Sequence, residues 1–389
     1  MEDLENIQPY TDEEAVEALQ RIARHPALPV ISKYLFPEFP SDSLKKQLME
    51  IKGVEDFQNT IVAKAVWVVL GRSASGFTYD GVNNLRNLPG EGRFLAISNH
   101  RDIVLDPALM QCVLLLNNIP LTEICVGSNL ISNRIVEGLL RSNRMITVIR
   151  GISAREMYLS SQILSKFIRD EVVSGKRSVW IAQREGRTKN GLDITEQGLL
   201  KMFDMSGTKD FKSNFKELNI VPMSISYEYE PCDSRKAREI LIKRMEGSYT
   251  KRGNEDMHSI LTGIRQQKGH IHLSVGEPLR PEEIAAAAQA DKNERYQRLR
   301  ETLDRRIISG YRLWKTNYMA HDLLHGSHSW AESGAYTDAD LAGFETYIAH
   351  KLGKLERRLD RQALREIFLG IYAGPVDSAL LLHNLYYVK

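Results

Sequence analysis

A histidine and two aspartates lie close together in one polar segment of the sequence. His100 follows the apolar run FLAIS, and Asp102 and Asp106 come two and six residues later. A carboxylate on one imidazole nitrogen fixes the tautomer of the ring and raises the basicity of the other nitrogen. Such a pair could act as a general base that takes a proton from a hydroxyl attacking a carbonyl. The alternatives are a surface-loop histidine and, for Asp106-Pro107, a helix N-cap followed by a first-turn proline.

Two further apolar runs lead into segments that contain Arg or Lys. The run ITVIR ends at Arg150 and precedes Gly151, and the run VWIAQ precedes the segment REGRTKNG of residues 184–191. Arginine holds phosphate through two parallel, charge-assisted hydrogen bonds. The pattern G-x-x-x-x-G-K-[ST] of nucleotide-hydrolysing phosphate loops is absent. These loops therefore predict a site for a phosphate or another anionic group that is not a phosphate loop of that type.

Positive charge is concentrated in one part of the sequence. The net charge is +2, yet residues 141–189 contain eleven Lys or Arg and four Asp or Glu. This segment suits an anionic ligand such as a phosphate, an acidic carrier protein or a lipid headgroup. The alternative is a set of solvated helix faces. Nucleic acid is not expected, because the sequence has no basic arm, zinc-finger spacing or aromatic RNA-binding signature.

Short apolar runs alternate with helical segments between residues 76 and 280. This alternation predicts an α/β domain with a largely parallel sheet and flanking helices. In such sheets the functional side chains lie in loops after the carboxyl ends of the strands, which is where His100 and Arg150 occur. The predicted strands are residues 94–98, 121–126, 145–149, 179–183, 220–227 and 270–275.

Helical sequence flanks this domain on both sides. We predict an N-terminal helical region (residues 1–75), an α/β core (76–280) and a C-terminal helical region (281–389). Thr11-Asp-Glu-Glu14 has the pattern of a capping box. A predicted helix over residues 54–71 has a broad apolar surface, typical of packing against a core, with membrane-surface binding as the alternative.

The composition is that of a globular protein in a reducing compartment. Hydrophobic residues make up 42% and charged residues 26% of the chain, which excludes disordered and fibrous classes. Three scattered cysteines are too few for a disulfide framework or a zinc ribbon. The first residues are acidic and polar, and no apolar run reaches 18 residues. We therefore expect neither a secretory signal peptide nor a membrane span.

A histidine cluster near the C-terminus is the candidate metal site. His321 and His325 have the i, i+4 spacing of a helical metal pair, and His328 follows. The metalloprotease motif H-E-x-x-H is absent, and nothing else in the sequence clearly completes a site. A polar surface or helix-capping cluster is the favoured interpretation, so no catalytic metal and no cofactor are predicted.

Four of these segments, in order, resemble the motif blocks of the glycerolipid acyltransferases, which include glycerol-3-phosphate and lysophosphatidate acyltransferases. The matching segments are SNHRDIVLDPALM, ITVIRG, REGRTKNG and IVPMSISYE, within residues 76–278. Two blocks depart from the family pattern. Five residues separate His100 from Asp106 where the family has four, and Arg187 follows Glu185-Gly186 directly where the family usually has one residue between.

The resemblance implies direct acyl transfer with His100 as the general base. Asp106 is the favoured partner of His100, because Leu-Asp-Pro-Ala is closer to the family block, and Asp102 is the fallback. Cations of the second and third blocks would bind the anionic head of the acceptor. The site residues implied for the acceptor are Arg150, Glu185, Gly186, Arg187 and Lys189.

The same resemblance implies the partners. The acyl donor would be acyl carrier protein or acyl-coenzyme A, and the acceptor glycerol 3-phosphate, a lysophospholipid or a related lyso-lipid. We expect a cytoplasmic protein, peripherally associated with the inner face of the membrane, docking through the 54–71 helix and the basic 141–189 segment. The alternatives are a non-catalytic lipid-binding protein on the same fold and a metal-dependent hydrolase that uses His321, His325 and His328.

Overall fold

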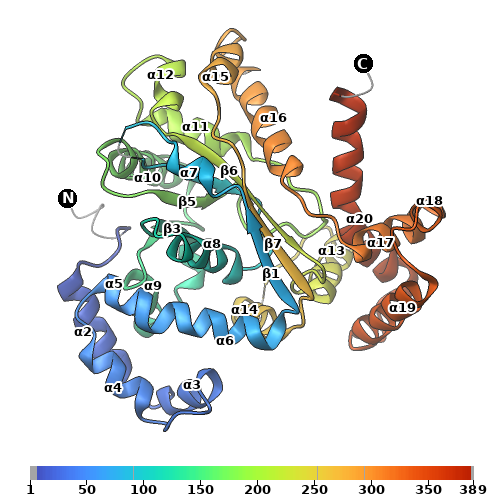
Figure 1. Ribbon diagram of the computed structural model, residues 1–389, viewed down its shortest axis with the longest axis horizontal. Coiled ribbons are helices and arrows are strands. Elements are labelled where there is room, and N and C mark those ends of the chain that lie inside the picture. The colour runs from blue at the N-terminus through green and yellow to red at the C-terminus, as the bar shows by residue number, and fades with distance from the viewer. Residues whose placement is uncertain (1–6, 91, 252, 293, 387–389) are drawn as a thin grey trace.

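A seven-stranded, largely parallel sheet forms the centre of the molecule (Figure 1). The computed structural model describes residues 7–386 apart from residues 91, 252 and 293. Within these residues the strand order is β1-β7-β6-β2-β5-β3-β4, and only β6 and β7 pair in antiparallel fashion. The predicted α/β class is therefore confirmed. The strands are β1 (Gly76–Asp80), β2 (Leu95–Ser98), β3 (Glu123–Gly127), β4 (Met145–Val148), β5 (Val179–Ala182), β6 (Ile220–Tyr227) and β7 (His270–Val275).

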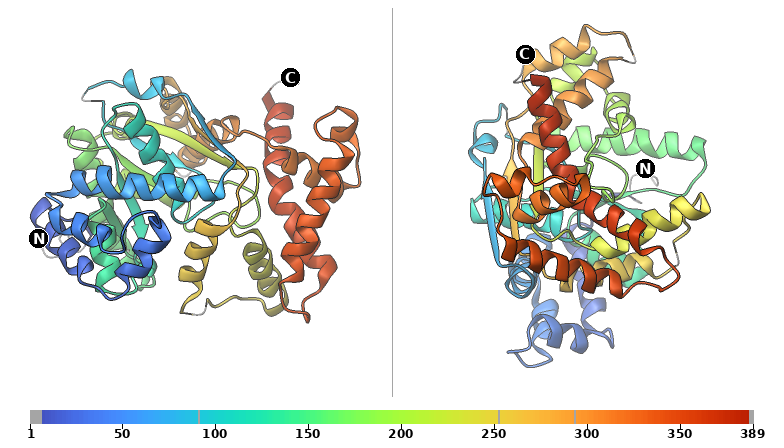
Figure 2. Two further views of the ribbon diagram at one scale, coloured as in Figure 1. Left: turned by 60° about the horizontal axis from the view of Figure 1, so that its bottom comes forward. Right: turned by 90° about the vertical axis from the view of Figure 1, so that its right-hand side faces the viewer.

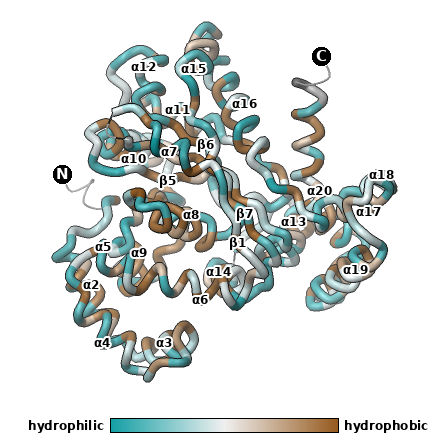
Figure 3. The backbone as a smooth tube through the Cα atoms, viewed as in Figure 1, coloured by the Kyte–Doolittle hydropathy of each residue, from teal (hydrophilic) through white to brown (hydrophobic). Residues whose placement is uncertain are grey.

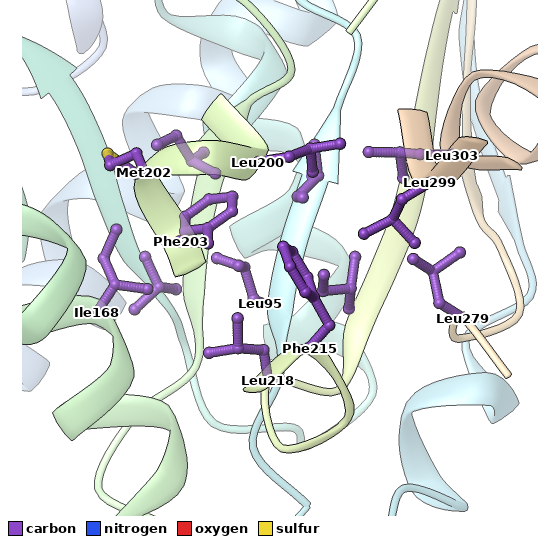
Figure 4. Close-up of a cluster of buried hydrophobic side chains, with 14 of the residues drawn as sticks. Leu95, Ile168, Leu200, Met202, Phe203, Phe215, Leu218, Leu279, Leu299 and Leu303 are labelled. Carbon is purple, nitrogen blue, oxygen red and sulfur yellow. The ribbon is translucent and has the colours of Figure 1, made fainter. Parts of the chain in front are cut away.

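Helices cover both faces of the sheet. Leu95 and Ile97 of β2 belong to a buried cluster on one face, and Ala96 belongs to a second cluster on the other face. Successive strand residues point to opposite faces, so the apolar strands anchor both helical layers. Figure 4 shows part of the first cluster. The helices of that face are α10 (Ala154–Val173), α11 (Gln197–Met205), α12 (Phe211–Lys216), α15 (Pro281–Ala288) and α16 (Glu294–Ser309).

The helix predicted over residues 54–71 packs on the second face. It is built from α5 (Val54–Phe57), a π-helical turn (Gln58–Val62) and α6 (Ala63–Ser73). Val66, Val69 and Leu70 are buried in the cluster that contains α8 (Leu105–Leu116), a strongly hydrophobic helix in Figure 3. These apolar residues are therefore occupied by the core, as the favoured interpretation predicts, while Trp67 of the same helix is 39% exposed; membrane binding by this helix stays a prediction.

The N-terminal helices form a small cluster of their own. Thr11 and Glu14 make the predicted capping box at the start of α2 (Asp12–Ala23). Leu19, Leu44 and Phe57 are buried together in this cluster, which α6 links to the sheet. The remaining short helices of this half are α3 (Leu28–Leu35), α4 (Ser43–Glu50), α7 (Asn83–Arg86), the 3-10 turn Ser128–Leu130 and α9 (Arg134–Arg141).

The C-terminal helices gather at the opposite end of the molecule from the N-terminal helices (Figure 2). Phe344, Phe368 and Tyr372 lie in a buried cluster that also includes α13 (Asp233–Glu246). In the described chain no helix is both long enough and apolar enough to cross a membrane. The other helices of this half are α14 (Glu255–Arg265), α17 (Lys315–His325), α18 (Ser329–Glu332), α19 (Asp338–Gly353) and α20 (Arg361–Tyr386).

Glu123, the first residue of β3, should make the stability of the protein depend on pH. Its carboxyl is buried, its Oε2 lacks a hydrogen-bond partner in the described structure, and Arg177 Nε lies 3.9 Å from Oε1. Burial, reinforced by Glu171, raises the pKa of Glu123 to about 8. The folded protein therefore retains a proton that the unfolded chain releases above about pH 4.3, and stability is lost as the pH rises toward 8.

Glu123→Gln is expected to remove this dependence, because the amide resembles the protonated carboxyl. Between about pH 5 and pH 8 the variant should gain about 3–4 kcal/mol of unfolding free energy relative to the wild type. Urea unfolding at the two pH values measures this gain. The half-exposed Glu294 offers the control Glu294→Gln, which should leave the pH dependence unchanged. Parallel pH profiles of Glu123→Gln and the wild type would contradict the expectation.

Candidate active site

The loops that follow β2 and β5 are fastened to each other and to strand β6 near the carboxyl edge of the sheet. Asn99, the first residue after β2, donates from Nδ2 to the carbonyl of Ile225 (3.0 Å) and accepts its N–H at Oδ1 (2.8 Å). The same Nδ2 donates to Asp193 Oδ2 (3.1 Å) in the loop after β5. All three residues come from segments far apart in the sequence, so this amide holds the loop that carries His100 in a defined position.

His100 and Asp106 are in direct contact. His100 Nδ1 lies 2.8 Å from Asp106 Oδ2, and the carboxylate is almost fully buried. The same oxygen accepts the backbone N–H of Arg101 (2.5 Å) and of Asp102 (2.9 Å), while Oδ1 accepts the hydroxyl of Tyr227 (2.7 Å). A carboxylate that receives these bonds is an acceptor, so Nδ1 carries the proton and Nε2 is left with its lone pair.

Asp102 has a different task. Its Oδ1 accepts the backbone N–H of Val104 (2.9 Å) and of Leu105 (2.8 Å), and thereby caps the first turn of α8. Residues 101–104 form a turn ahead of the helix, and Asp106 lies within the first helical turn. The five-residue spacing therefore brings Asp106 back to His100, because residues 101–104 precede the helix. Of the two aspartates left open by the sequence, the structure places Asp106 against the ring.

A buried network of charges lies directly behind this pair. The Arg101 side chain is 5% exposed, and its Nη2 and Nη1 lie 2.6 Å from Asp193 Oδ2 and 3.3 Å from Glu230 Oε2. Lys236 Nζ lies 2.6 Å from Glu230 Oε1 and donates to the Arg101 carbonyl (2.9 Å). Burial by itself would raise the pKa of Asp193, but the Arg101 guanidinium and hydrogen bonds from neighbouring side chains outweigh it and hold the pKa below its usual range.

The glycine- and cation-rich loop lies against His100. The N–H of Thr188 donates to the carbonyl of His100 (2.8 Å). Within the described structure, Nη1 of Arg187 is buried and has no hydrogen-bond partner. Gly186 adopts φ +66°, a left-handed conformation that glycine reaches without strain. The backbone of the loop therefore contacts His100, whereas the Arg187 side chain interacts with Cys232.

The other predicted anion-binding residues point in different directions. Arg150 Nη1, in the loop after β4, lies 3.4 Å from Glu185 Oε1, so these two predicted residues are brought together. Lys189 instead forms an ion pair with Glu239 of α13. Burial lowers the pKa of Lys189 despite this partner. Arg150 thus lies at the edge of the site in an ion pair with a largely exposed glutamate, whereas Lys189 pairs with a residue of α13.

The basic 141–189 segment is divided between the two edges of the sheet. At the amino edge, Arg177 and Lys176 pair with Glu123 and Glu171. Arg169 is buried and pairs with Glu217. The cations of this segment therefore do not all lie on one surface. The cations of this segment in the loops at the carboxyl edge, or in the first turn beyond them, are Arg150, Arg155, Arg184, Arg187 and Lys189.

The last helix of the chain packs against the same loop. Gly191 has φ +80°, and a Cβ at this position would lie 2.4 Å from the carbonyl oxygen of Ile371 in α20. Pro375 lies four residues after Ile371 and has no N–H to donate to that carbonyl. The Gly191 carbonyl in turn accepts Nη2 of Arg101 (3.4 Å). The C-terminal helix therefore supports the loop next to the buried charges.

Gly191→Ala is expected to destabilise the protein by at least about 2 kcal/mol, because it adds a strained φ and a collision with backbone that cannot move freely. The unfolding free energy in urea measures this loss. Gly198→Ala is the matched control, because Gly198 lies in the first turn of α11 and a Cβ there meets no atom within 4 Å. Equal stability of the two variants would show that the contact with α20 does not constrain the loop.

The C-terminal histidines meet an aspartate of α20. His321 Nε2 and His325 Nε2 lie 3.5 Å and 3.2 Å from Asp377 Oδ1, and His328 is not part of this group. Trp330 Nε1 donates to His321 Nδ1 (3.2 Å). A neutral ring that accepts at Nδ1 carries its proton on Nε2, whereas a metal-binding histidine usually donates from its second nitrogen. The arrangement suits a hydrogen-bonded clasp between α17 and α20 better than a prepared metal site.

Residues 81–226 match the family model described as Acyltransferase. This domain belongs to the acyltransferase family. The match confirms the prediction of an acyltransferase from the four sequence blocks. It includes the His100–Asp106 pair and both cationic loops, and it ends before Tyr227 and Glu230, which complete the buried surroundings of the pair.

One solved structure similar to this acyltransferase is the 1-acyl-sn-glycerophosphate (LPA) acyltransferase PlsC from Thermotoga maritima. The two chains are 13% identical, the match covers 76% of this chain and 93% of the other, and the TM-score is 0.38. The chain has no match among curated protein sequences.

The sequence did not indicate the residues that surround the pair. Tyr227, Glu230 and Lys236 lie more than 120 positions from Asp106 or Arg101, with which they form hydrogen bonds. A buried lysine or arginine is rare unless paired, but burial is not visible in a polar segment of sequence. Tyr227 alone had a local signal, because it is the last residue of a strand that ends at the same edge as β2.

Proposed function

We propose that this acyltransferase moves a fatty acyl group from an acyl thioester to the hydroxyl of glycerol 3-phosphate, a lysophospholipid or a related lyso-lipid. The donor is acyl carrier protein or acyl-coenzyme A. The observation that carries the proposal is the 2.8 Å contact between His100 Nδ1 and Asp106 Oδ2 inside the acyltransferase domain. It leaves Nε2 of His100 as a base at the carboxyl edge of the sheet.

In the proposed reaction, Nε2 of His100 takes the proton of the acceptor hydroxyl as the oxygen attacks the thioester carbonyl. Asp106 keeps the ring in the required tautomer and stabilises the imidazolium that forms. The tetrahedral intermediate then collapses to an ester, and the thiolate leaves and is protonated by the imidazolium. This sequence restores neutral His100, and none of its steps uses a cofactor.

The acceptor's anionic head would bind at the cations of the loops after β4 and β5. Arg187 supports this placement, because its side chain is half-buried and its Nη1 has no hydrogen-bond partner in the described structure, so a phosphate oxygen could add a charge-assisted hydrogen bond once the side chain turns toward the site. Arg150 would contribute once Glu185 turns away, and Gly186 allows the backbone to approach closely. Lys189 would have to leave Glu239 to take part.

The location proposed for the enzyme is the cytoplasm, with peripheral association to the inner face of the membrane. The candidate acceptors include lipids that reside in a bilayer, and their product is more apolar than the acceptor. An enzyme acting on them gains by working at the surface that holds them. Of the two candidate docking regions predicted from the sequence, the 54–71 helix packs Val66, Val69 and Leu70 in the core, whereas the 141–189 segment still has exposed residues at the start of α10.

The test is an acyl-transfer assay on the purified protein. Acyl carrier protein and coenzyme A carrying a labelled acyl group are each offered to glycerol 3-phosphate and to a lysophospholipid, with His100→Ala beside the wild type. Transfer that falls by about 10³-fold in His100→Ala supports the proposal and names both substrates. Lipid binding without transfer would support the non-catalytic alternative. Hydrolysis that needs a metal found in the purified protein would support the metal-dependent hydrolase.

A further inference from the structure

The first two turns of α10 extend beyond the rest of the protein. All seven residues from Ser153 to Leu159 are exposed, and burial in this helix begins only at Leu164. A helix that packs along its length buries a residue every three or four positions. This stretch breaks that rule over about 10 Å of helix. No described segment of the chain therefore covers the beginning of α10.

Three consecutive large apolar side chains occupy this uncovered stretch. Met157 is 37% exposed, Tyr158 57% and Leu159 48%. In a soluble monomer such residues usually occur singly, and a contiguous apolar group at the surface indicates a binding surface. Methionine and leucine insert readily among acyl chains, and tyrosine prefers the level of the lipid headgroups. The composition of this stretch therefore fits the boundary between water and a bilayer.

The uncovered turns lie at the edge of the sheet that carries His100. Helix α10 follows β4 and runs back along the sheet, so its first residue is at the carboxyl end of the strands. β4 and β2 are three strand positions apart, which corresponds to about 14 Å. A lipid surface that receives the beginning of α10 would consequently face the candidate active site.

The surroundings of these turns are positively charged. Three stretches reach this edge, residues 128–137, 149–159 and 183–190, and together they contain six Lys or Arg and three Asp or Glu; with Glu239 of α13, the partner of Lys189, these groups carry a net charge of +2. Positive charge beside an apolar tip is the combination that binds anionic membranes, because the two attractions act together. Because of this positive charge, the occupant of the surface is a bilayer of anionic lipid and not an uncharged apolar partner.

We propose that the first two turns of α10 insert into the headgroup region of an anionic lipid bilayer. This docking turns the His100 edge of the sheet toward the lipids that contain the acceptor, and in that respect it rests on the proposed function. Met157, Tyr158 and Leu159 provide the insertion, and Arg150 and Arg155 contact the anionic headgroups. The docking element is thus the helix after the second sequence block, not the helix of residues 54–71.

Leu159→Glu tests the proposal, with Val173→Glu as its matched control. Leu159 and Val173 belong to the same helix and are both 48% exposed, but they lie about 21 Å apart along it. Flotation of the full chain is measured with vesicles of phosphatidylglycerol and phosphatidylcholine and with vesicles of phosphatidylcholine alone. Acyl transfer is measured with a lysophospholipid in the mixed vesicles and with the same acceptor dispersed in detergent.

The expected result is that Leu159→Glu lowers both flotation with the anionic vesicles and transfer in them by about tenfold, while transfer in detergent is unchanged. Val173→Glu should behave like the wild type in every assay. The proposal would be overturned if Leu159→Glu floated with the anionic vesicles as well as the wild type does, or if Val173→Glu lost as much flotation as Leu159→Glu. A loss of transfer in detergent with normal flotation would also overturn it and would indicate docking of the acyl donor. Absent transfer with normal wild-type flotation would instead contradict the proposed function alone.

Discussion

Asp106→Asn is expected to lower the turnover number kcat of acyl transfer by about 10³- to 10⁴-fold. The Asp106 carboxylate accepts from His100 Nδ1, from two backbone N–H groups and from the hydroxyl of Tyr227. An amide has a single acceptor oxygen, so its NH₂ group must face at least one of these donors. If it faces the ring, Nδ1 becomes the acceptor and the proton moves to Nε2, where it blocks the base. Assays of kcat and KM with saturating donor measure the effect.

Asp102→Asn provides the control, because Asp102 lies four residues away and is also buried. Its Oδ1 caps two N–H groups at the start of α8, and asparagine caps a helix about as well as aspartate. Transfer by this variant should stay within a few-fold of the wild type. A large loss in Asp102→Asn together with an active Asp106→Asn would reverse the proposed roles of the two aspartates.

The sheet could be predicted from sequence because its central strands are buried on both faces. The six predicted apolar runs correspond to β2 through β7, each within about two residues. β1 was not predicted, because it is an edge strand that pairs only with β7 and exposes Thr78, Tyr79 and Asp80. Such a strand needs no continuous apolar run. The antiparallel pairing of β6 and β7 also left no local signal, since it depends on where the chain returns to the sheet.

The candidate site divides in the same way between local and distant contacts. His100, Asp102 and Asp106 lie within seven residues, so their proximity followed from the sequence, although the choice of partner did not. The choice between Asp102 and Asp106 depends on a turn at residues 101–104. The catalytic role of the His100–Asp106 pair stays a prediction. The charges behind the pair come from three distant segments, and Arg101 by itself has the character of any polar loop residue. Tertiary folding alone brings Asp193 and Glu230 to it.

Arg101→Met is expected to lower the free energy of unfolding by about 3–5 kcal/mol, the largest stability loss anticipated for this protein. The guanidinium lies between the buried carboxylates of Asp193 and Glu230. Methionine fills much of the same space but leaves both carboxylates without this cation, and only Glu230 retains Lys236. Urea unfolding measures the loss. The exposed pair Arg298–Glu294 gives the control Arg298→Met, which should cost less than about 1 kcal/mol.

The pH dependence of this loss distinguishes a missing charge from a packing defect. In the wild type, Arg101 and the hydrogen bonds hold the pKa of Asp193 below its usual value, so the stability contributed by Asp193 is present above about pH 4 and is lost at lower pH. Without the guanidinium, burial dominates and raises the folded-state pKa above the unfolded value. The pH dependence of the contribution of Asp193 to stability then reverses its sign, and protonation of Asp193 restores stability to the variant as the pH falls. The stability deficit of Arg101→Met relative to the wild type should therefore shrink as the pH falls from about 7 to about 5. A deficit that stays constant over this range would mean that lost packing, not the unpaired carboxylates, destabilises the variant.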